Sequence, residues 1–307
     1  MIALTCPGQG AQTPGFLSPW LELDSFKAAI EKYSAVLEMD LVHFGTKADA
    51  DQIKDTRVAQ PLIVAASMAS HAVLIQALKD KSIIAGVAGH SVGEIAAANI
   101  AGVLDTEAAL RFVKARGEQM ANAASLEASS MAAVVGGEPE VVVDHLESMG
   151  LFAANYNGKG QIVAAGSAAK IQELVANPPA GTRVVGLAVA GAFHTSFMET
   201  AKVELASLAG SINTSNPEML IWSNSDGSRV DSGERFLELL IDQVSKPVRW
   251  DKTMESMTTD GVTALIELLP GGTLTGIAKR AMPGVATLAL KTPEDLEKAV
   301  LFVKEQS

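Results

Sequence analysis

The feature that most restricts the fold of this 307-residue chain is an apolar run that leads through a turn directly into a helix. Ser82–Gly89 (SIIAGVAG) is almost entirely apolar and ends in glycine, which is typical of a parallel strand buried on both faces. The alanine-rich segment Glu94–Val103 follows almost at once and is expected to be a helix. Because such strands need helices on both sides of their sheet, the sequence predicts an α/β fold.

Segments before and after this unit fit the same architecture. Ile2–Thr5 is a short apolar strand that runs into a glycine-rich turn. Helical spacing of apolar residues is found at Trp20–Met39, Pro61–Lys79 and Thr106–Ala124, and the tail from Leu288 is a strand followed by an amphipathic helix beginning near Pro293. Hydrophobic residues make up 48% of the chain, enough for one large domain together with a small one.

A second pattern, with short strands that pair locally, interrupts the first. Strands are expected at Met131–Val135, Leu151–Asn155, Gln161–Ala165 and Arg183–Val189, with helices at Pro139–Ser148 and Ser167–Ala176. Asn157–Gly160 (NGKG) is a hairpin signal between the middle two strands. The order β-α-β-β-α-β is the ferredoxin-like arrangement. We therefore expect a small ferredoxin-like domain at 127–190, inserted in a large domain formed by 1–126 and 191–307.

Charge and cysteine content exclude several classes of function. The formal net charge is −11, which argues against nucleic acid or an anionic membrane as the main partner. The single cysteine, Cys6, and an N-terminus without an export signal indicate a cytoplasmic protein. Val58–Leu78 carries no charge and is long enough to span a membrane, but its interspersed polar side chains favour a buried helix. The few His and Cys residues show no metal-ligand spacing, so we expect neither a metal nor a cofactor.

Ser91 is the candidate nucleophile. It lies in Gly89–Gly93 (GHSVG), a match to G-x-S-x-G, and its strand–turn–helix context is the one in which this motif exposes a serine hydroxyl. A helix that begins directly after Ser91 points backbone N–H groups at an oxyanion formed there. The alternative is that Ser91 only caps the helix while the glycines serve packing.

His194 is the candidate base among the five histidines. It lies in a loop before a helix that is expected to open with a capping box at Ser196 and Glu199. A helix N-terminus favours the neutral imidazole that a general base requires. The alternative is a structural loop histidine. His90 adjoins Ser91 in the turn, so its side chain is expected to point elsewhere.

Short motifs spread over nearly the whole chain resemble one family. They are PGQGAQ at 7–12, VAQP at 58–61, GHSVGE at 89–94, RG at 116–117, NYNGKGQIVAAG at 155–166, GAFHT at 191–195, Gln243 with PVRW at 247–250, and GGTLTGIAKR at 271–280. The chain is similar to the malonyl-CoA:acyl carrier protein transacylases and to the acyltransferase domains of fatty-acid and polyketide synthases. That resemblance implies an α/β-hydrolase-like core with a ferredoxin-like insertion.

The resemblance also implies roles for individual residues. Ser91 would be the nucleophile and His194 the base, with the imidazole oriented by the backbone carbonyl of Gln243. The backbone N–H groups of Gln9 and Val92 would form the oxyanion hole, with valine where leucine is commoner. Two further side chains would contact the acyl group: Arg116 would pair with the free carboxylate of malonate, and Phe193 would close the acyl pocket.

The implied function is transfer of a malonyl group from malonyl-CoA to the phosphopantetheine thiol of holo acyl carrier protein for fatty-acid biosynthesis. A serine thioesterase, a transacylase for another acyl group or for a polyketide carrier, and a docking module with a relic site are the alternatives. Nothing in the sequence demands more than a monomer. Because an acidic carrier would be repelled by the net charge, we expect a local basic rim formed by Lys279, Arg280, Lys246 and Arg249.

Overall fold

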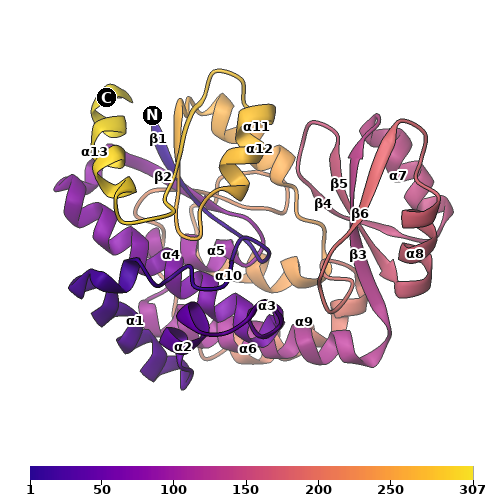
Figure 1. Cartoon of the computed structure of the whole chain (residues 1–307), viewed down its shortest axis with the longest axis horizontal. Helices are drawn as coiled ribbons and strands as arrows, with labels where there is room; N and C mark the ends of the chain where they lie inside the picture. The colour runs from indigo at the N-terminus through magenta and orange to yellow at the C-terminus, as the bar shows by residue number, and fades with distance from the viewer. Residues whose placement is uncertain (307) are drawn as a thin grey trace.

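Two separate β-sheets organise the computed structural model, one parallel and one antiparallel (Figure 1). The structure describes residues 1–306, apart from the side chain of Lys81. The parallel sheet has five strands in the order β7-β2-β1-β8-β9, and the antiparallel sheet has four in the order β4-β5-β3-β6. The α/β class and the division into a parallel and an antiparallel sheet are thereby confirmed.

The central strands of the parallel sheet are buried on both faces, and its edge strand β9 is partly exposed. Its strands are β1 (Ile2–Cys6), β2 (Ile84–Gly89), β7 (Leu220–Trp222), β8 (Ala264–Glu267) and β9 (Ala286–Ala289). Alternate residues of β1 enter different cores: Leu4 packs into the larger hydrophobic cluster, while Ala3 packs into a second cluster with Trp222. Burial on both faces explains why the β2 segment is a continuous apolar run rather than an alternating one.

Helices cover the two faces of this sheet unequally. The larger cluster includes side chains from α1 (Asp24–Leu37), α4 (Thr56–Leu78), α5 (Gly93–Ile100), α6 (Thr106–Leu126), α9 (Glu199–Ala209), α10 (Gly233–Asp242) and α13 (Asp295–Gln306). The smaller cluster is formed with α11 (Trp250–Thr259) and α12 (Thr273–Ala281), which lie across the sheet from α4 and α5 (Figure 1).

Short elements complete this part of the chain. They are α2 (Leu41–Thr46), α3 (Ala50–Lys54) and the 3₁₀ turns η1 (Trp20–Glu22), η2 (Lys81–Ile83), η3 (Ser196–Met198) and η4 (Gln243–Ser245).

The long, predominantly apolar helix α4 is a core helix, and Arg57 in its first turn is its one residue of the Asp, Glu, Lys and Arg types. It begins at Thr56 rather than at Pro61 as predicted, because the side chain of Asp55 accepts a hydrogen bond from the N–H of Arg57 and caps it. The helix therefore accommodates Pro61 within its length. It is long and apolar enough to cross a membrane, and 78% of its most apolar window is buried inside the protein. The prediction of a buried helix is confirmed.

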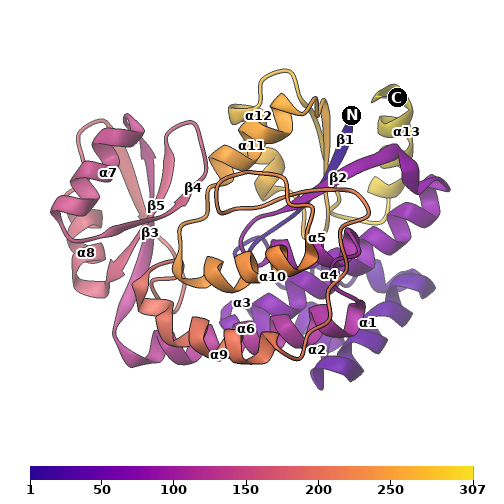
Figure 2. The same cartoon turned by 180° about the vertical axis from the view of Figure 1, so that it is seen from behind.

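The antiparallel sheet follows the predicted element order. Its elements are β3 (Ser129–Gly136), α7 (Pro139–Ser148), β4 (Phe152–Tyr156), β5 (Gln161–Ser167), α8 (Ala168–Ala176) and β6 (Thr182–Gly186). A separate apolar cluster, which includes Val134, Leu146 and Leu174, joins the sheet to its two helices. The last strand ends at Gly186 rather than at Val189, and the chain then turns back toward the larger sheet (Figure 2).

One backbone contact ties the antiparallel sheet to the rest of the molecule. The N–H of Tyr156 donates to the carbonyl of Val248 at 2.9 Å, and the N–H of Val248 donates to the carbonyl of Ala154 at 2.9 Å. Val248 thus extends the sheet at its β4 edge, next to η4 and α11. This connection fixes the two sheets relative to each other at the place where residues from both surround Ser91.

Candidate active site

Ser91 lies in a sharp turn between β2 and α5. Its φ of 53° is in the left-handed region, which a residue other than glycine adopts only when its surroundings impose it. The turn is closed by close backbone approaches that leave no room for side chains: a Cβ on Gly89 would collide with the backbone of Gly93, and a Cβ on Gly93 would collide with the carbonyl of Cys6. Glycine is therefore required at both positions for steric reasons. The turn directs the Ser91 hydroxyl into a cavity.

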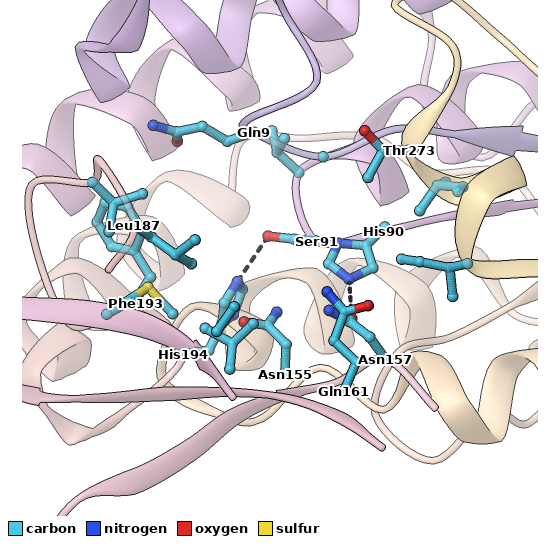
Figure 3. Close-up of a pocket in the computed structure, with 18 of the residues that line it drawn as sticks. Gln9, His90, Ser91, Asn155, Asn157, Gln161, Leu187, Phe193, His194 and Thr273 are labelled. Atoms are coloured by element: carbon cyan, nitrogen blue, oxygen red, sulfur yellow. Dashed lines mark hydrogen bonds between the residues drawn. The ribbon is translucent and has the colours of Figure 1, made fainter. Parts of the chain in front are cut away.

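His194 is placed to accept the proton of Ser91. Its Nε2 lies 2.7 Å from the Ser91 Oγ, and its Nδ1 lies 2.7 Å from the backbone carbonyl of Gln243 (Figure 3). Because a carbonyl can only accept, the proton sits on Nδ1, which leaves Nε2 free to accept from the hydroxyl. Burial, together with the positive charge of Arg116, lowers the pKa of His194 to about 3, so the imidazole is neutral at physiological pH.

The local structure that holds His194 differs from the predicted capping box. The helix α9 begins at Glu199, and it is Thr195 that caps the preceding 3₁₀ turn by accepting a hydrogen bond from the N–H of Phe197. The prediction of a capping box formed by Ser196 and Glu199 was therefore wrong. His194 is fixed instead through its own N–H, which donates to the carbonyl of Val244 at 3.0 Å, and it adopts a left-handed φ of 62°.

Arg116 is a fully buried cation beside the hydroxyl. Only 1% of the residue is exposed, and its Nη2 lies 3.4 Å from the Ser91 Oγ. Two amide oxygens hold the guanidinium: Nη1 donates to Oε1 of Gln60 at 2.7 Å, and Nη2 donates to Oε1 of Gln243 at 2.9 Å. Burial lowers the pKa of Arg116 to about 10, against the opposing effect of Glu94, so it keeps its charge. Arg116 is not itself among the lining residues of the cavity, but Gln60 and Ser91, which it contacts, both are, so its N–H groups are suited to pairing with an anionic group held beside Ser91.

A buried polar network lies beneath the turn. The N–H of Ser91 donates to Oδ1 of Asn224 at 2.8 Å, and Nδ2 of Asn224 donates to the carbonyl of Gly89 at 2.8 Å. Oε1 of Glu94 accepts from the N–H of Asn224 at 2.6 Å, and its Oε2 accepts from Nε2 of Gln243. Burial raises the pKa of Glu94 to about 8.

Sequence reasoning missed the roles of Gln60, Glu94 and Asn224. Glu94 could have been noticed from the sequence, because it is the one charged residue in a helix that otherwise contains only apolar residues and an asparagine. Gln60 could also have been noticed, as a polar residue in the uncharged segment Val58–Leu78, although it was used only to argue against a membrane span. Asn224 follows a short strand with nothing in its sequence context to mark it.

The cavity above Ser91 has a volume of about 190 Å³ and is lined by the turns that follow β1 and β2, by helix residues and by strands of the antiparallel sheet. Gln9 and Val92 line it, and their backbone N–H groups donate to no acceptor within residues 1–306. The side chain of Gln9 extends away from Ser91 and donates to the carbonyl of Lys54 at 3.2 Å (Figure 3). Unpaired backbone N–H groups near a reactive hydroxyl are the kind of donor that can stabilise an oxyanion.

The remaining lining is mostly apolar. Phe193 is 6% exposed and lies next to His194 in the cavity wall, with Leu187 near it (Figure 3). His90 turns away from the nucleophile, as expected, and its Nε2 lies 2.9 Å from Oδ1 of Asn157. The arrangement can deprotonate a hydroxyl, stabilise an oxyanion and bind a small anionic group, which together are the requirements of acyl transfer from a carboxylated donor.

Comparison with known proteins agrees with this chemistry. A family model described as "Acyl transferase domain" matches residues 4–301. The chain is 45% identical, over 302 residues, to the malonyl CoA-acyl carrier protein transacylase of Mycobacterium tuberculosis (strain ATCC 25618 / H37Rv), covering 97% of this chain and 99% of that protein. The transacylase of the same name from Bacillus subtilis (strain 168) is 30% identical, covering 100% and 98%.

The chain belongs to the acyl transferase domain family.

Solved structures show the same fold at full length. The crystal structure of MCAT from Mycobacterium tuberculosis matches with a TM-score of 0.93 and 44% identity, covering 98% of this chain and 99% of that one. A holo type II PKS acyl-carrier protein in complex with its malonyl-transacylase also matches, with a TM-score of 0.93 and 29% identity, covering 98% and 99%. That neighbouring structure shows a malonyl-transacylase in complex with its acyl-carrier protein.

The basic residues expected at the rim of this acyl transferase site differ in their surroundings. Lys279 and Arg280 are exposed at the end of α12, and Arg280 donates to Oε1 of Gln161, a cavity residue, at 3.1 Å. The other two are engaged by carboxylates: Lys246 pairs with Asp242 at 2.9 Å, and Arg249 forms a two-pronged pair with Asp251 at 2.9 and 2.8 Å. Only the α12 pair thus presents charge that is not offset by a neighbouring acid within hydrogen-bond distance.

Residues 1–306 contain no cluster of three or more His, Cys, Asp or Glu side chains that could hold a metal ion.

Proposed function

We propose that this chain is a malonyl-CoA:acyl carrier protein transacylase that acts through a malonyl ester on Ser91. The observation that supports it most is the position of Arg116, a fully buried cation whose Nη2 lies 3.4 Å from the Ser91 Oγ. An uncharged acyl group would gain nothing from that cation. A malonyl group carries a second carboxylate, which must be paired once it enters a buried cavity.

The first half of the reaction acylates the enzyme. His194 Nε2 takes the proton of Ser91 Oγ, and the oxygen attacks the thioester carbon of malonyl-CoA. The tetrahedral oxyanion accepts hydrogen bonds from the N–H groups of Gln9 and Val92, each worth roughly 10²–10³ in rate. The C–S bond then breaks, His194 returns the proton to the CoA thiolate, and the malonyl group remains on Ser91.

The second half reverses these steps with a new thiol. The phosphopantetheine thiol of holo acyl carrier protein gives its proton to His194 and attacks the ester carbonyl of malonyl-Ser91. The C–O bond breaks and His194 protonates the Ser91 oxygen. Because the backbone carbonyl of Gln243 holds the imidazole in one orientation, the same ring serves both directions without a carboxylate partner.

Arg116 and Phe193 would set the choice of acyl group. Arg116 would pair with the distal carboxylate through its N–H groups that the two amide oxygens leave free. Phe193 would close the cavity near the malonyl α-carbon and disfavour a methyl branch there, an effect of about 1–3 kcal/mol.

Several further assignments are part of this proposal. The large domain would comprise 1–126 and 191–307, with 127–190 as the small domain that forms the other cavity wall. The enzyme would need no cofactor or metal, work in the cytoplasm as a monomer, and supply extender units for fatty-acid biosynthesis. Its carrier would dock at a rim that includes Lys279 and Arg280.

Steady-state kinetics with malonyl-CoA and holo carrier protein test the transfer. A ping-pong pattern of parallel double-reciprocal lines is expected, with turnover abolished in Ser91→Ala and retained in the exposed control Ser148→Ala. Release of free malonate at the same rate with or without carrier would contradict the proposal and indicate a thioesterase. Undiminished turnover in Ser91→Ala would contradict a mechanism that passes through a malonyl ester on Ser91.

A further inference from the structure

Glu94 is a buried carboxyl for which the proposed mechanism has no use. It is 1% exposed, lies in the first turn of α5 and does not line the cavity. Both of its oxygens are occupied: Oε1 accepts from the N–H of Asn224 at 2.6 Å, and Oε2 accepts from Nε2 of Gln243. Burying a carboxyl costs free energy. A role for Glu94 must therefore be sought in the two groups that its hydrogen bonds hold in place, Asn224 and Gln243.

The contact with Gln243 selects one orientation of that amide. Nε2 of Gln243 faces three acceptors, namely Oε2 of Glu94, the carbonyl of Ser91 at 3.2 Å and Oδ1 of Asn224 at 3.3 Å. Since the amide has a donor end and an acceptor end, its oxygen must point the other way. There it accepts from Nη2 of Arg116 at 2.9 Å.

A reversed amide would be incompatible with both sides of this arrangement. It would turn its carbonyl oxygen toward the carbonyl of Ser91 and Oδ1 of Asn224, which have no proton to donate, and its NH₂ group toward the guanidinium of Arg116, which has only donors. The hydrogen bonds among these three side chains therefore run in one direction. Arg116 donates to the oxygen of the Gln243 amide, and the nitrogen of that amide donates to Glu94.

We propose that Glu94 is a positioning residue that, through the side-chain amide of Gln243, holds the Arg116 guanidinium in place for the carboxylate of the acyl group. This inference rests on the proposed malonyl transfer. Gln60 takes one N–H of Nη1 and Gln243 takes one N–H of Nη2, so a second N–H on Nη1 stays available for the substrate and the second on Nη2 is directed at the Ser91 Oγ, where the acyl group would be attached. Selectivity for a carboxylated acyl donor thus depends on a residue that touches neither the substrate nor Arg116.

The isosteric variant Glu94→Gln tests this directly. Its new NH₂ group must face either the N–H of Asn224 or Nε2 of Gln243, and because the backbone N–H cannot turn, the amide of Gln243 reverses. We expect kcat/KM for acylation to fall roughly ten- to a hundredfold with malonyl-CoA and less than about threefold with acetyl-CoA, because only malonate loses its partner. Glu94→Asp, which keeps two accepting oxygens, should recover part of the malonyl preference.

Further variants separate positioning from general destabilisation. Gln243→Leu keeps the backbone carbonyl that orients His194 but removes the amide, and it should lower the malonyl-to-acetyl ratio as Glu94→Gln does. In the double variant the two effects should not add, because they act through one contact. Glu107→Gln, an exposed acid on α6, serves as the matched control with an unchanged ratio.

The outcomes decide between the two hypotheses. Equal losses for both acyl donors, additive effects in the double variant, or no recovery in Glu94→Asp would overturn the role of Glu94. If Glu94→Gln does not fold, Glu94→Asp and Gln243→Leu carry the same comparison. Failure of the unaltered enzyme to transfer malonate would instead overturn the proposed function, and it is measured first in the same experiment.

Discussion

Replacing Arg116 with alanine is predicted to abolish the preference for malonyl-CoA while leaving acyl transfer itself in place. The guanidinium is 1% exposed, and in its absence the malonyl carboxylate would be buried without a partner. Removing one partner of a buried ion pair costs about 3–5 kcal/mol. At about 1.36 kcal/mol for each factor of ten, kcat/KM for malonyl-CoA should fall roughly 10²–10⁴-fold.

Acetyl-CoA provides the internal reference for that measurement. It has no distal carboxylate, and Arg116 affects the groups that act on its thioester only through the 3.4 Å contact with the Ser91 hydroxyl and through its charge, which contributes to lowering the pKa of His194. We expect its kcat/KM to change by less than about tenfold. Pre-steady-state acylation by each donor gives both values without the carrier, and Arg111→Ala, an exposed arginine on the same helix, is the control.

A parallel loss with both donors would refute this reasoning, because it would mean that Arg116 supports the fold or the nucleophile rather than the carboxylate. Arg116→Lys refines the comparison. Lysine keeps the charge but lacks the planar fork, so it should recover part of the malonyl rate and not all of it. Thermal unfolding of each variant shows whether the cavity left by the side chain has lowered stability.

Three other predictions follow from the same geometry. Because the pKa of His194 is lowered to about 3, the imidazole stays neutral as pH falls from 7 to 5, so kcat/KM should be flat in that range; an acid limb centred near 6.5 would contradict the placement of His194. Gly93→Ala puts a methyl group against the carbonyl of Cys6 and should lower the free energy of unfolding by about 1–3 kcal/mol, measured by urea denaturation, whereas an unchanged midpoint would mean that the turn has room. Reversing the charge of Lys279 and Arg280 should raise KM for the carrier protein in transfer kinetics and leave acylation by malonyl-CoA unaltered. An unchanged KM would contradict the proposal that the carrier docks at these two residues.

Matched variants make the last two predictions specific. Gly276→Ala adds the same methyl group to α12, where nothing lies within 4 Å of it, and should not destabilise the protein. Lys304→Glu reverses one charge on the exposed end of α13 and should leave KM for the carrier unchanged.

The main features of the fold follow from the sequence because they depend on local chemistry. The continuous apolar run of β2 and the tight turn at Ser91 predict the parallel sheet and the exposed hydroxyl, and the NGKG hairpin anchors the order of the small sheet. Exact boundaries were less predictable, because caps decide them. Asp55 starts α4 ahead of Pro61, and Thr195 takes the role predicted for Ser196.

From local sequence patterns alone, a site residue was predictable only where it lies within a recognisable motif, as Ser91 does in G-x-S-x-G. Spacing along the chain does not show that Arg116 turns inward, and a helix arginine is ordinarily solvated. Its burial depends on Gln60 and Gln243, which come from other helical segments and reach it only in the folded chain. Asn224 likewise enters the buried polar network only through long-range packing, and no local pattern marks it.

Intact-mass spectrometry of the acylated enzyme tests the central claim most directly. The protein is mixed with malonyl-CoA, freed of excess donor and divided between buffer and holo acyl carrier protein. The account predicts one malonyl group per chain, absent in Ser91→Ala, that persists in buffer and moves to the carrier thiol. An enzyme that gains no mass, gains it in Ser91→Ala, or loses it equally fast without the carrier would contradict the account.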